Sequence, residues 1–64
     1  MTVKNRLRKI RLTMDITQTE MAQLLEVTQQ QYNRYERQKT QPSLEIALRI
    51  EKKLNQRDIF YLAD

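Results

Sequence analysis

Four side chains between positions 29 and 34 carry groups suited to recognising nucleic-acid bases. They are three amides and one guanidinium group: Gln29, Gln30, Asn33 and Arg34. Such groups pair bidentately with the edges of adenine and guanine in the major groove of DNA. Tyr32 and Tyr35 are three residues apart, so a helix places them on one side and leaves the polar groups on another. A helix that buries its tyrosines could therefore display these polar groups to a duplex.

The segment from Thr17 to Arg37 contains the elements that would position these groups. Thr17 and Glu20 have the spacing of a capping box, in which hydroxyl and carboxylate each accept a hydrogen bond from a free backbone N–H group. Thr and Gln at positions 28 and 31 repeat this signal eleven residues later, so a second helix should begin near Gln29. The first helix has an apolar face made of Met21, Ala22, Leu24 and Leu25. The segment therefore predicts two short helices joined by a tight turn.

These residues resemble the helix-turn-helix of the Cro and phage-repressor family, also called the XRE family. The resemblance depends on combined spacing, because no single position is specific: Thr17-Gln18, Met21-Ala22, Leu25, Val27-Thr28, Tyr32, Tyr35-Glu36, Lys39 and Pro42-Ser43-Leu44. It extends along nearly the whole chain through Leu7, Ile10, Arg11, Leu48, Ile50 and Leu54.

The family usually has glycine at three places where this chain has Asp15, Glu26 and Gln38, and the chain contains no glycine at all. Asp tolerates a left-handed backbone fairly well, whereas Glu and Gln adopt it at a cost of ~1 kcal/mol or more. If Glu26 holds the place of the turn glycine, it is expected to adopt a positive φ.

The resemblance implies an all-α fold of four to five short helices, similar to the lambda-repressor domain, with residues 1–64 as one domain. It also implies sequence-specific binding of double-stranded DNA by a transcriptional regulator, most simply a repressor. Residues 29–37 would then form the recognition helix in the major groove. A domain of this size covers few base pairs, so useful affinity suggests a homodimer on a palindromic operator with half-sites ~10 bp apart.

Individual DNA contacts follow from the same resemblance. Gln29, Gln30 and Arg34 would read base edges, and Thr28 would contact a thymine methyl group or a phosphate. The residues expected to contact the DNA backbone are Gln18, Asn33, Arg37 and Lys39. Gln18 has a second argument, because free N–H groups and the helix dipole at the start of a helix attract an anion such as phosphate.

Apolar spacing predicts further helices on both sides of the motif. Residues 2–14 would form a first helix with a buried stripe at Val3, Leu7, Ile10 and Met14. Arg11 lies beside this stripe, and the resemblance implies a partly buried ion pair between Arg11 and Glu36. A later helix would begin after the cap Ser43 and bury Leu44, Ala47, Leu48, Ile50 and Leu54.

Residues 57–62 would form a short last helix or turn. Four apolar residues follow one another there: Ile59, Phe60, Tyr61 and Leu62. One helix face cannot bury all four, so one or two are expected to stay exposed. Exposed apolar residues near a chain end mark a site of self-association or of contact with a partner. Tyr61 or Leu62 is therefore predicted to contribute to a homodimer contact.

The composition of the chain argues against several classes of function. The chain has 64 residues and neither cysteine nor histidine, which excludes disulfides and argues against a zinc site or other cofactor. No catalytic constellation is visible, and the chain is too small to enclose a substrate pocket, so neither an enzyme nor a small-molecule ligand is predicted. The absence of cysteine fits a cytoplasmic location, and neither a signal peptide nor a membrane span is visible.

The net charge of +4 is concentrated near the N-terminus. Five basic residues precede the first acid: Lys4, Arg6, Arg8, Lys9 and Arg11. Such charge attracts phosphate, anionic lipid or acidic proteins without distinguishing them, and a solvated helix face is its ordinary explanation.

Other interpretations remain open at this point. The fold could serve as a protein-interaction module, such as an antitoxin or adaptor, that docks through residues 59–62. A basic helix on a membrane surface is poorly supported, because the first helix lacks large aromatic anchors. The tyrosines could stack on bases, the glutamine run could be a low-complexity accident, and Lys39 could be an ordinary loop lysine.

Overall fold

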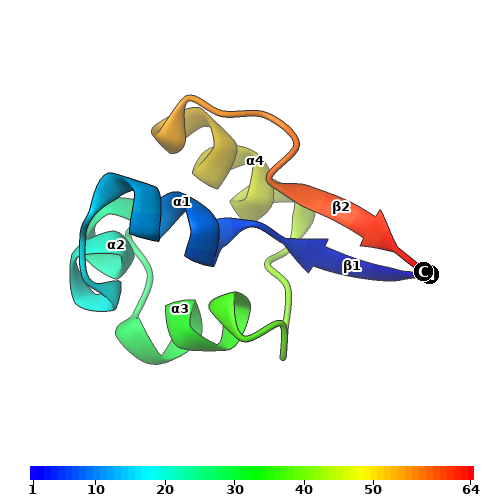
Figure 1. The fold of residues 1–64 in the computed structure, drawn as a ribbon, viewed down its shortest axis with the longest axis horizontal. Coiled ribbons are helices and arrows are strands. Elements are labelled where there is room, and N and C mark those ends of the chain that lie inside the picture. Colours follow the sequence, from blue (N-terminus) through cyan, green and yellow to red (C-terminus); the bar gives the residue numbers. More distant parts are fainter.

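Four short helices and a two-stranded antiparallel ribbon make up the computed structural model, which describes all 64 residues (Figure 1). In chain order the elements are β1 (Thr2–Asn5), α1 (Leu7–Met14), α2 (Gln18–Leu25), α3 (Gln29–Glu36), α4 (Leu44–Leu54) and β2 (Phe60–Ala63). The predicted helical fold class is confirmed, because the four helices form the body of the molecule and the ribbon is a minor addition.

Side-chain caps explain where three of the helices begin. The Thr17 hydroxyl accepts from the Glu20 N–H at 3.1 Å, and the Glu20 carboxylate accepts from the Thr17 N–H at 2.9 Å, which completes the predicted capping box. The Thr28 hydroxyl caps α3 by accepting from the Gln31 N–H at 3.1 Å. Ser43 caps α4 in the same way. These local bonds place α2, α3 and α4 where the sequence predicts them to start.

Left-handed residues follow each helix in this glycine-free chain. Asp15, Glu26 and Asn55 are the C-caps of α1, α2 and α4, with φ of 58°, 60° and 51°. Gln38, two residues after α3, has φ of 63°. The positive φ expected for Glu26 is therefore confirmed, and the tight turns of the family form here without glycine.

Nine buried apolar side chains from all four helices and the segment before β2 make up the core: Leu7, Ile10, Met21, Ala22, Leu25, Tyr32, Tyr35, Ile50 and Ile59. Tyr32 and Tyr35 are 0% and 1% exposed, as expected for core residues. Their burial fixes which side of α3 faces inward.

The prediction for the buried side of α4 is partly wrong. Leu44 and Leu48 are 76% and 57% exposed. Ile46, Ile50 and Leu54, spaced four residues apart, pack into or against the core instead. The apolar residues of this helix cover more of its circumference than the core can bury, so the sequence pattern alone leaves the inward direction ambiguous.

Both predicted terminal helices need correction. Residues Thr2–Asn5 form β1 rather than the first turns of a helix, and α1 begins at Leu7. Residues 57–62 form no helix, and β2 occupies Phe60–Ala63. Val3 and Met14 are accordingly exposed, which shortens the buried stripe of α1 to Leu7 and Ile10.

The strands pair across nearly the full length of the sequence. Thr2 lies opposite Ala63 and Asn5 lies opposite Phe60. Local periodicity cannot reveal this pairing, because each strand has only four residues and its partner lies at the other end of the chain.

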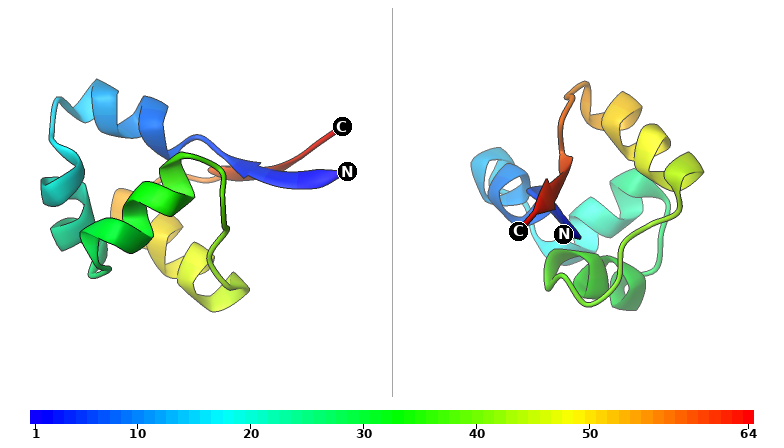
Figure 2. Two further views of the ribbon diagram at one scale, coloured as in Figure 1. Left: turned by 90° about the horizontal axis from the view of Figure 1, so that it is seen from below. Right: turned by 90° about the vertical axis from the view of Figure 1, so that its right-hand side faces the viewer.

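The ribbon is fixed at its base and free at its tip. At the base, Ile59 is fully buried and its carbonyl accepts from the Arg6 N–H at 3.0 Å. The Arg6 guanidinium lies 4.1 Å from the centre of the Tyr61 ring and also donates to the Asp58 carbonyl. The other end of the ribbon extends away from the helices, with both chain ends at its tip (Figure 2).

Candidate nucleic-acid interface

Helix α3 presents a polar outward face opposite its buried side. Tyr32, Tyr35 and Glu36 are buried. Four of the residues predicted to contact DNA are exposed along or just after this helix: Gln29, Gln30, Arg34 and Arg37. When the molecule is seen from below, α3 lies in front of the other elements (Figure 2, left). Amides and guanidinium groups are thus held on an accessible helix surface.

Thr28 and Lys39 flank this helix. Thr28 is exposed, and its hydroxyl accepts the capping bond from Gln31, so its methyl group, its O–H donor and its second lone pair are what it can offer a ligand. Lys39 is exposed in the loop after α3, where its N–H donates to the Arg34 carbonyl at 3.0 Å. The loop that carries Lys39 is therefore tied by its backbone to the helix.

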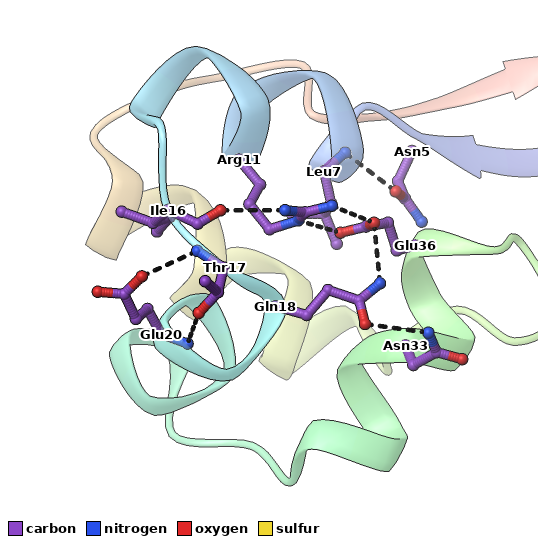
Figure 3. A network of polar contacts seen from close by, with 9 residues as sticks. All are labelled: Asn5, Leu7, Arg11, Ile16, Thr17, Gln18, Glu20, Asn33 and Glu36. Atoms are coloured by element: carbon purple, nitrogen blue, oxygen red, sulfur yellow. Dashed lines mark hydrogen bonds and ion pairs between the residues drawn. The ribbon is translucent and has the colours of Figure 1, made fainter.

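Gln18, the first residue of α2, reaches α3 through two hydrogen bonds (Figure 3). Its Nε2 donates to Glu36 Oε1 at 3.1 Å, and its Oε1 accepts from Asn33 Nδ2 at 3.2 Å. Both amides are half-buried. The structure thus joins the predicted contact residues of α2 to those of α3, and it fixes the directions of their remaining donors.

Arg11 and Glu36 form an ion pair between α1 and the end of α3 (Figure 3). Arg11 Nε and Nη2 donate to the two Glu36 oxygens at 2.9 and 3.0 Å, which is the bidentate geometry favoured by guanidinium and carboxylate. Arg11 Nη1 donates to the Ile16 carbonyl at 3.0 Å. The two side chains are 14% and 3% exposed, so this is a largely buried contact.

Several groups act on the charge of Glu36. Burial raises the pKa of this carboxyl, but hydrogen bonds from Arg11 and Gln18, with the Tyr32 hydroxyl nearby, outweigh burial and lower the pKa to about 2. Burial also raises the pKa of the Tyr32 hydroxyl well above its ordinary value. That hydroxyl has no hydrogen-bond partner of regular geometry, although the Glu36 carboxylate and Arg11 are near it. Glu36 therefore stays ionised and holds both Arg11 and Gln18.

Sequence reasoning missed a second polar cluster at the end of α3, made of Asn5, Gln38 and Gln41. The Asn5 N–H donates to Gln38 Oε1 at 3.0 Å, and Gln38 Nε2 donates to the Asn5 carbonyl at 2.9 Å. Asn5 Nδ2 donates to the Tyr35 carbonyl at 2.8 Å and to Gln41 Oε1 at 2.9 Å. No local pattern predicts these contacts, because Asn5 lies thirty or more positions before these partners.

The basic residues before position 10 lie elsewhere on the surface. Arg6, Arg8 and Lys9 line an open cleft of about 600 Å³ between α1 and β2, with Tyr61 on its wall. No residue of α3 lines this cleft. The charge of Arg6, Arg8 and Lys9 thus gathers at a cleft that α3 does not line.

The structure has neither a cluster of metal-ligating side chains nor a helix suited to span a membrane. No group of three or more His, Cys, Asp or Glu side chains is arranged to hold a metal ion. None of the four helices has both the length and the apolar surface needed to pass through a bilayer.

Comparison with known proteins assigns the family. A family model described as helix-turn-helix matches residues 7–62, which include all four helices and most of β2. No curated protein matches the chain. The matched region contains the capped helix pair α2–α3, the turn at Glu26 and the exposed face of α3. The chain therefore belongs to the Cro/C1-type helix-turn-helix family, the XRE family of DNA-binding proteins.

Proposed function

We propose that this protein is a transcriptional regulator, acting as a repressor, that binds a specific sequence in double-stranded DNA. The observation that carries the proposal is the outward face of α3, where amides and guanidinium groups are exposed while the opposite side fills the core. Membership of a DNA-binding family supports it. In this proposal α3 enters the major groove with its N-terminal residues foremost.

Base reading is assigned to the exposed side chains of α3. Gln29 and Gln30, in its first turn, offer an amide donor and acceptor that match the N6 and N7 edge of adenine. Arg34, one turn later, suits the O6 and N7 edge of guanine. Thr28 offers its methyl group to thymine or its hydroxyl donor to a phosphate.

Phosphate binding is assigned to residues around the reading face: Gln18, Asn33, Arg37 and Lys39. Gln18 stands at the N-terminus of α2, where free N–H groups and the helix dipole favour an anion. The hydrogen bonds among Gln18, Asn33 and Glu36 orient the first two side chains before DNA arrives, which lowers the entropy cost of the contacts.

A homodimer on a palindromic operator completes the proposal, with half-sites ~10 bp apart. The exposed ribbon supports a contact between copies, because Val3 and Leu62 are cross-strand partners and are 42% and 66% exposed. Tyr61 is 38% exposed on the same strand. Sedimentation of the free protein and of its DNA complex tests this contact. A monomer under both conditions at high concentration would remove the dimer from the proposal.

Selection of bound sites from a random DNA pool tests the proposed function directly. The selected duplex and a scrambled duplex of equal length are then titrated at several salt concentrations. Specific binding predicts a clear preference for the selected duplex that survives added salt. Equal, weak and strongly salt-dependent binding to both would instead favour the antitoxin or adaptor interpretation, in which the exposed residues of β2 dock a protein.

A further inference from the structure

The side-chain amide of Gln38 makes the two hydrogen bonds to the Asn5 backbone that a neighbouring strand would make. It accepts from the Asn5 N–H at 3.0 Å and donates to the Asn5 carbonyl at 2.9 Å. Gln38 itself has a left-handed backbone, and its N–H donates to the Tyr35 carbonyl at 3.0 Å. A glycine at this position would relieve backbone strain but could not make the two contacts with β1.

The side chain of Asn5 completes the same connection from the other direction. It is 5% exposed and donates to both the Tyr35 carbonyl and Gln41 Oε1. The Tyr35 carbonyl is one of the last four of α3, which lack partners within the helix. Gln41 Nε2 donates in turn to Gln38 Oε1 at 3.1 Å. One strand residue therefore adds a second donor to the Tyr35 carbonyl, beside the Gln38 N–H, and holds the loop 38–41.

Asn5 is held from two sides, by its bonds to residues 35–41 and by β1, in which its register partner is Phe60. An isolated two-stranded ribbon is marginally stable in water. Fraying of the ribbon would loosen Asn5, and Gln38, Gln41 and the Tyr35 carbonyl would each lose their hydrogen bonds to it, keeping only the local bonds within residues 35–41. The residue between Gln38 and Gln41 that carries charge is Lys39.

We propose that the β1–β2 ribbon controls the DNA affinity of the protein by positioning the loop that carries Lys39. Asn5 and Gln38 are the positioning residues, and neither contacts DNA. When the ribbon is ordered, Lys39 is held in a fixed place. When the ribbon is frayed, the loop 38–41 must become ordered as DNA binds, and the conformational entropy lost in this step weakens the affinity. This inference rests on the proposed DNA binding and adds a regulatory role for an element remote from the reading face.

A reversible lock on the ribbon tests the inference. Arg6 and Ile59 are hydrogen-bonded across the ribbon, through the Arg6 N–H and the Ile59 carbonyl. Because hydrogen-bonded and non-hydrogen-bonded pairs alternate along an antiparallel ladder, Val3 and Leu62 form a non-hydrogen-bonded pair. The Cβ atoms of such a pair approach closely enough for a disulfide. The double variant Val3→Cys with Leu62→Cys can be titrated on the selected duplex in oxidised and reduced forms. The parent has no cysteine, so the same treatments applied to it provide the control.

Oxidation of the double variant is expected to tighten binding to the selected duplex by about threefold to tenfold. It should also slow hydrogen exchange of the Lys39 and Thr40 N–H groups, which donate to the Arg34 carbonyl. Equal affinity in the two redox states, with the disulfide verified by mass, would overturn the inference.

Adding Gln38→Ala to the locked protein separates this mechanism from an effect on dimer contacts. If the ribbon acts through Gln38, oxidation no longer changes DNA affinity in that background, provided a thermal melt shows the protein folded. If the gain on oxidation persists, the ribbon acts by another route and the positioning role is wrong. Failure of the proposed function looks different, because the unlocked parent would then not distinguish the selected duplex from the scrambled one.

Discussion

The two ends of α3 are held in different ways. Its N-terminal end has one capping bond from Thr28 and follows the turn at Glu26, whose side chain is 76% exposed and pairs with Lys53 at 3.2 Å on the surface. Its C-terminal end has buried polar contacts, including the Arg11–Glu36 ion pair and the bond from Asn5 to the Tyr35 carbonyl.

This difference matches the different tasks of the two ends. Side chains that read bases must keep their donors and acceptors free, so the proposed reading role of Gln29 and Gln30 requires that their end of the helix is not fixed by contacts within the protein. Rigidity has to come from the opposite end, where Glu36 and Tyr35 are tied to α1 and β1. The variants below test this division, beginning with the largest expected effect.

Replacing Arg11 with Ala should come close to unfolding the protein. Removing one member of a buried ion pair leaves the other charge unpaired and costs ~3–5 kcal/mol, and a domain this small has little more than ~5 kcal/mol in total. The matched control is Arg49→Ala, which breaks the exposed pair with Glu45 and should cost under ~1 kcal/mol. A thermal midpoint for Arg11→Ala within ~3 °C of the parent would refute the importance of the Arg11–Glu36 ion pair for stability.

Acid should weaken the same end of α3 through Glu36. Its pKa is lowered from the ordinary 4.5 to about 2, so its contribution is complete above pH 4.5 and is lost as pH falls toward 2. The lost free energy of unfolding should be about 3 kcal/mol. Denaturant melts between pH 6 and 2.5 measure it.

The control for the acid prediction is Glu36→Gln, which should be less stable at neutral pH and less sensitive to acid. A smaller dependence will remain in that variant, because hydrogen bonding by Thr17 also lowers the pKa of the exposed Glu20. Parallel curves for parent and variant would show that Glu36 is not the group responsible.

DNA titrations should separate the two ends by function. Gln29→Ala removes a base-reading amide and should cost ~1–3 kcal/mol on the selected duplex and almost nothing on a scrambled one. Lys39→Ala should weaken binding to both duplexes alike and reduce the salt slope by about one. An equal loss on both duplexes for Gln29→Ala would mean that α3 is not the reading element.

The smallest effects concern the two left-handed turns that flank α3. Glu26→Gly should stabilise the protein by up to ~1 kcal/mol, because it relieves positive φ and loses only a surface ion pair. Gln38→Gly relieves similar strain but should destabilise, because two contacts with Asn5 disappear. Lys53→Ala removes the surface pair together with the 3.4 Å bond from Lys53 Nζ to the Leu24 carbonyl, so it sets an upper limit on the loss from the pair. The same sign for both glycine variants would contradict the distinction between the two turns.

Local signals explain how much of this structure could be predicted. The starts of α2, α3 and α4 are encoded by Thr17, Thr28 and Ser43, each within a few residues of the groups it caps. Tyr32 and Tyr35 define the inner side of α3, and with it the outer side that forms the candidate site.

Contacts between distant residues explain what could not be predicted. The ribbon pairs residue 2 with residue 63, and four-residue strands carry too little pattern to distinguish them from helix. The roles of Asn5 and Gln38 depend on that pairing and stayed hidden for the same reason. The inward direction of α4 was missed because Leu44 and Leu48 are as apolar as the residues that the core accepts.

The pairing of β1 with β2 also has a consequence for folding during synthesis on the ribosome. Asn5 is synthesised early but has no strand partner until residues 60–63 have left the exit tunnel. Helices α1 to α4 supply eight of the nine core side chains, so they can begin to pack before that moment. The nascent chain should therefore pass through a stage in which α3 exists with its outer face complete while Asn5, although already made, has no strand partner beside it.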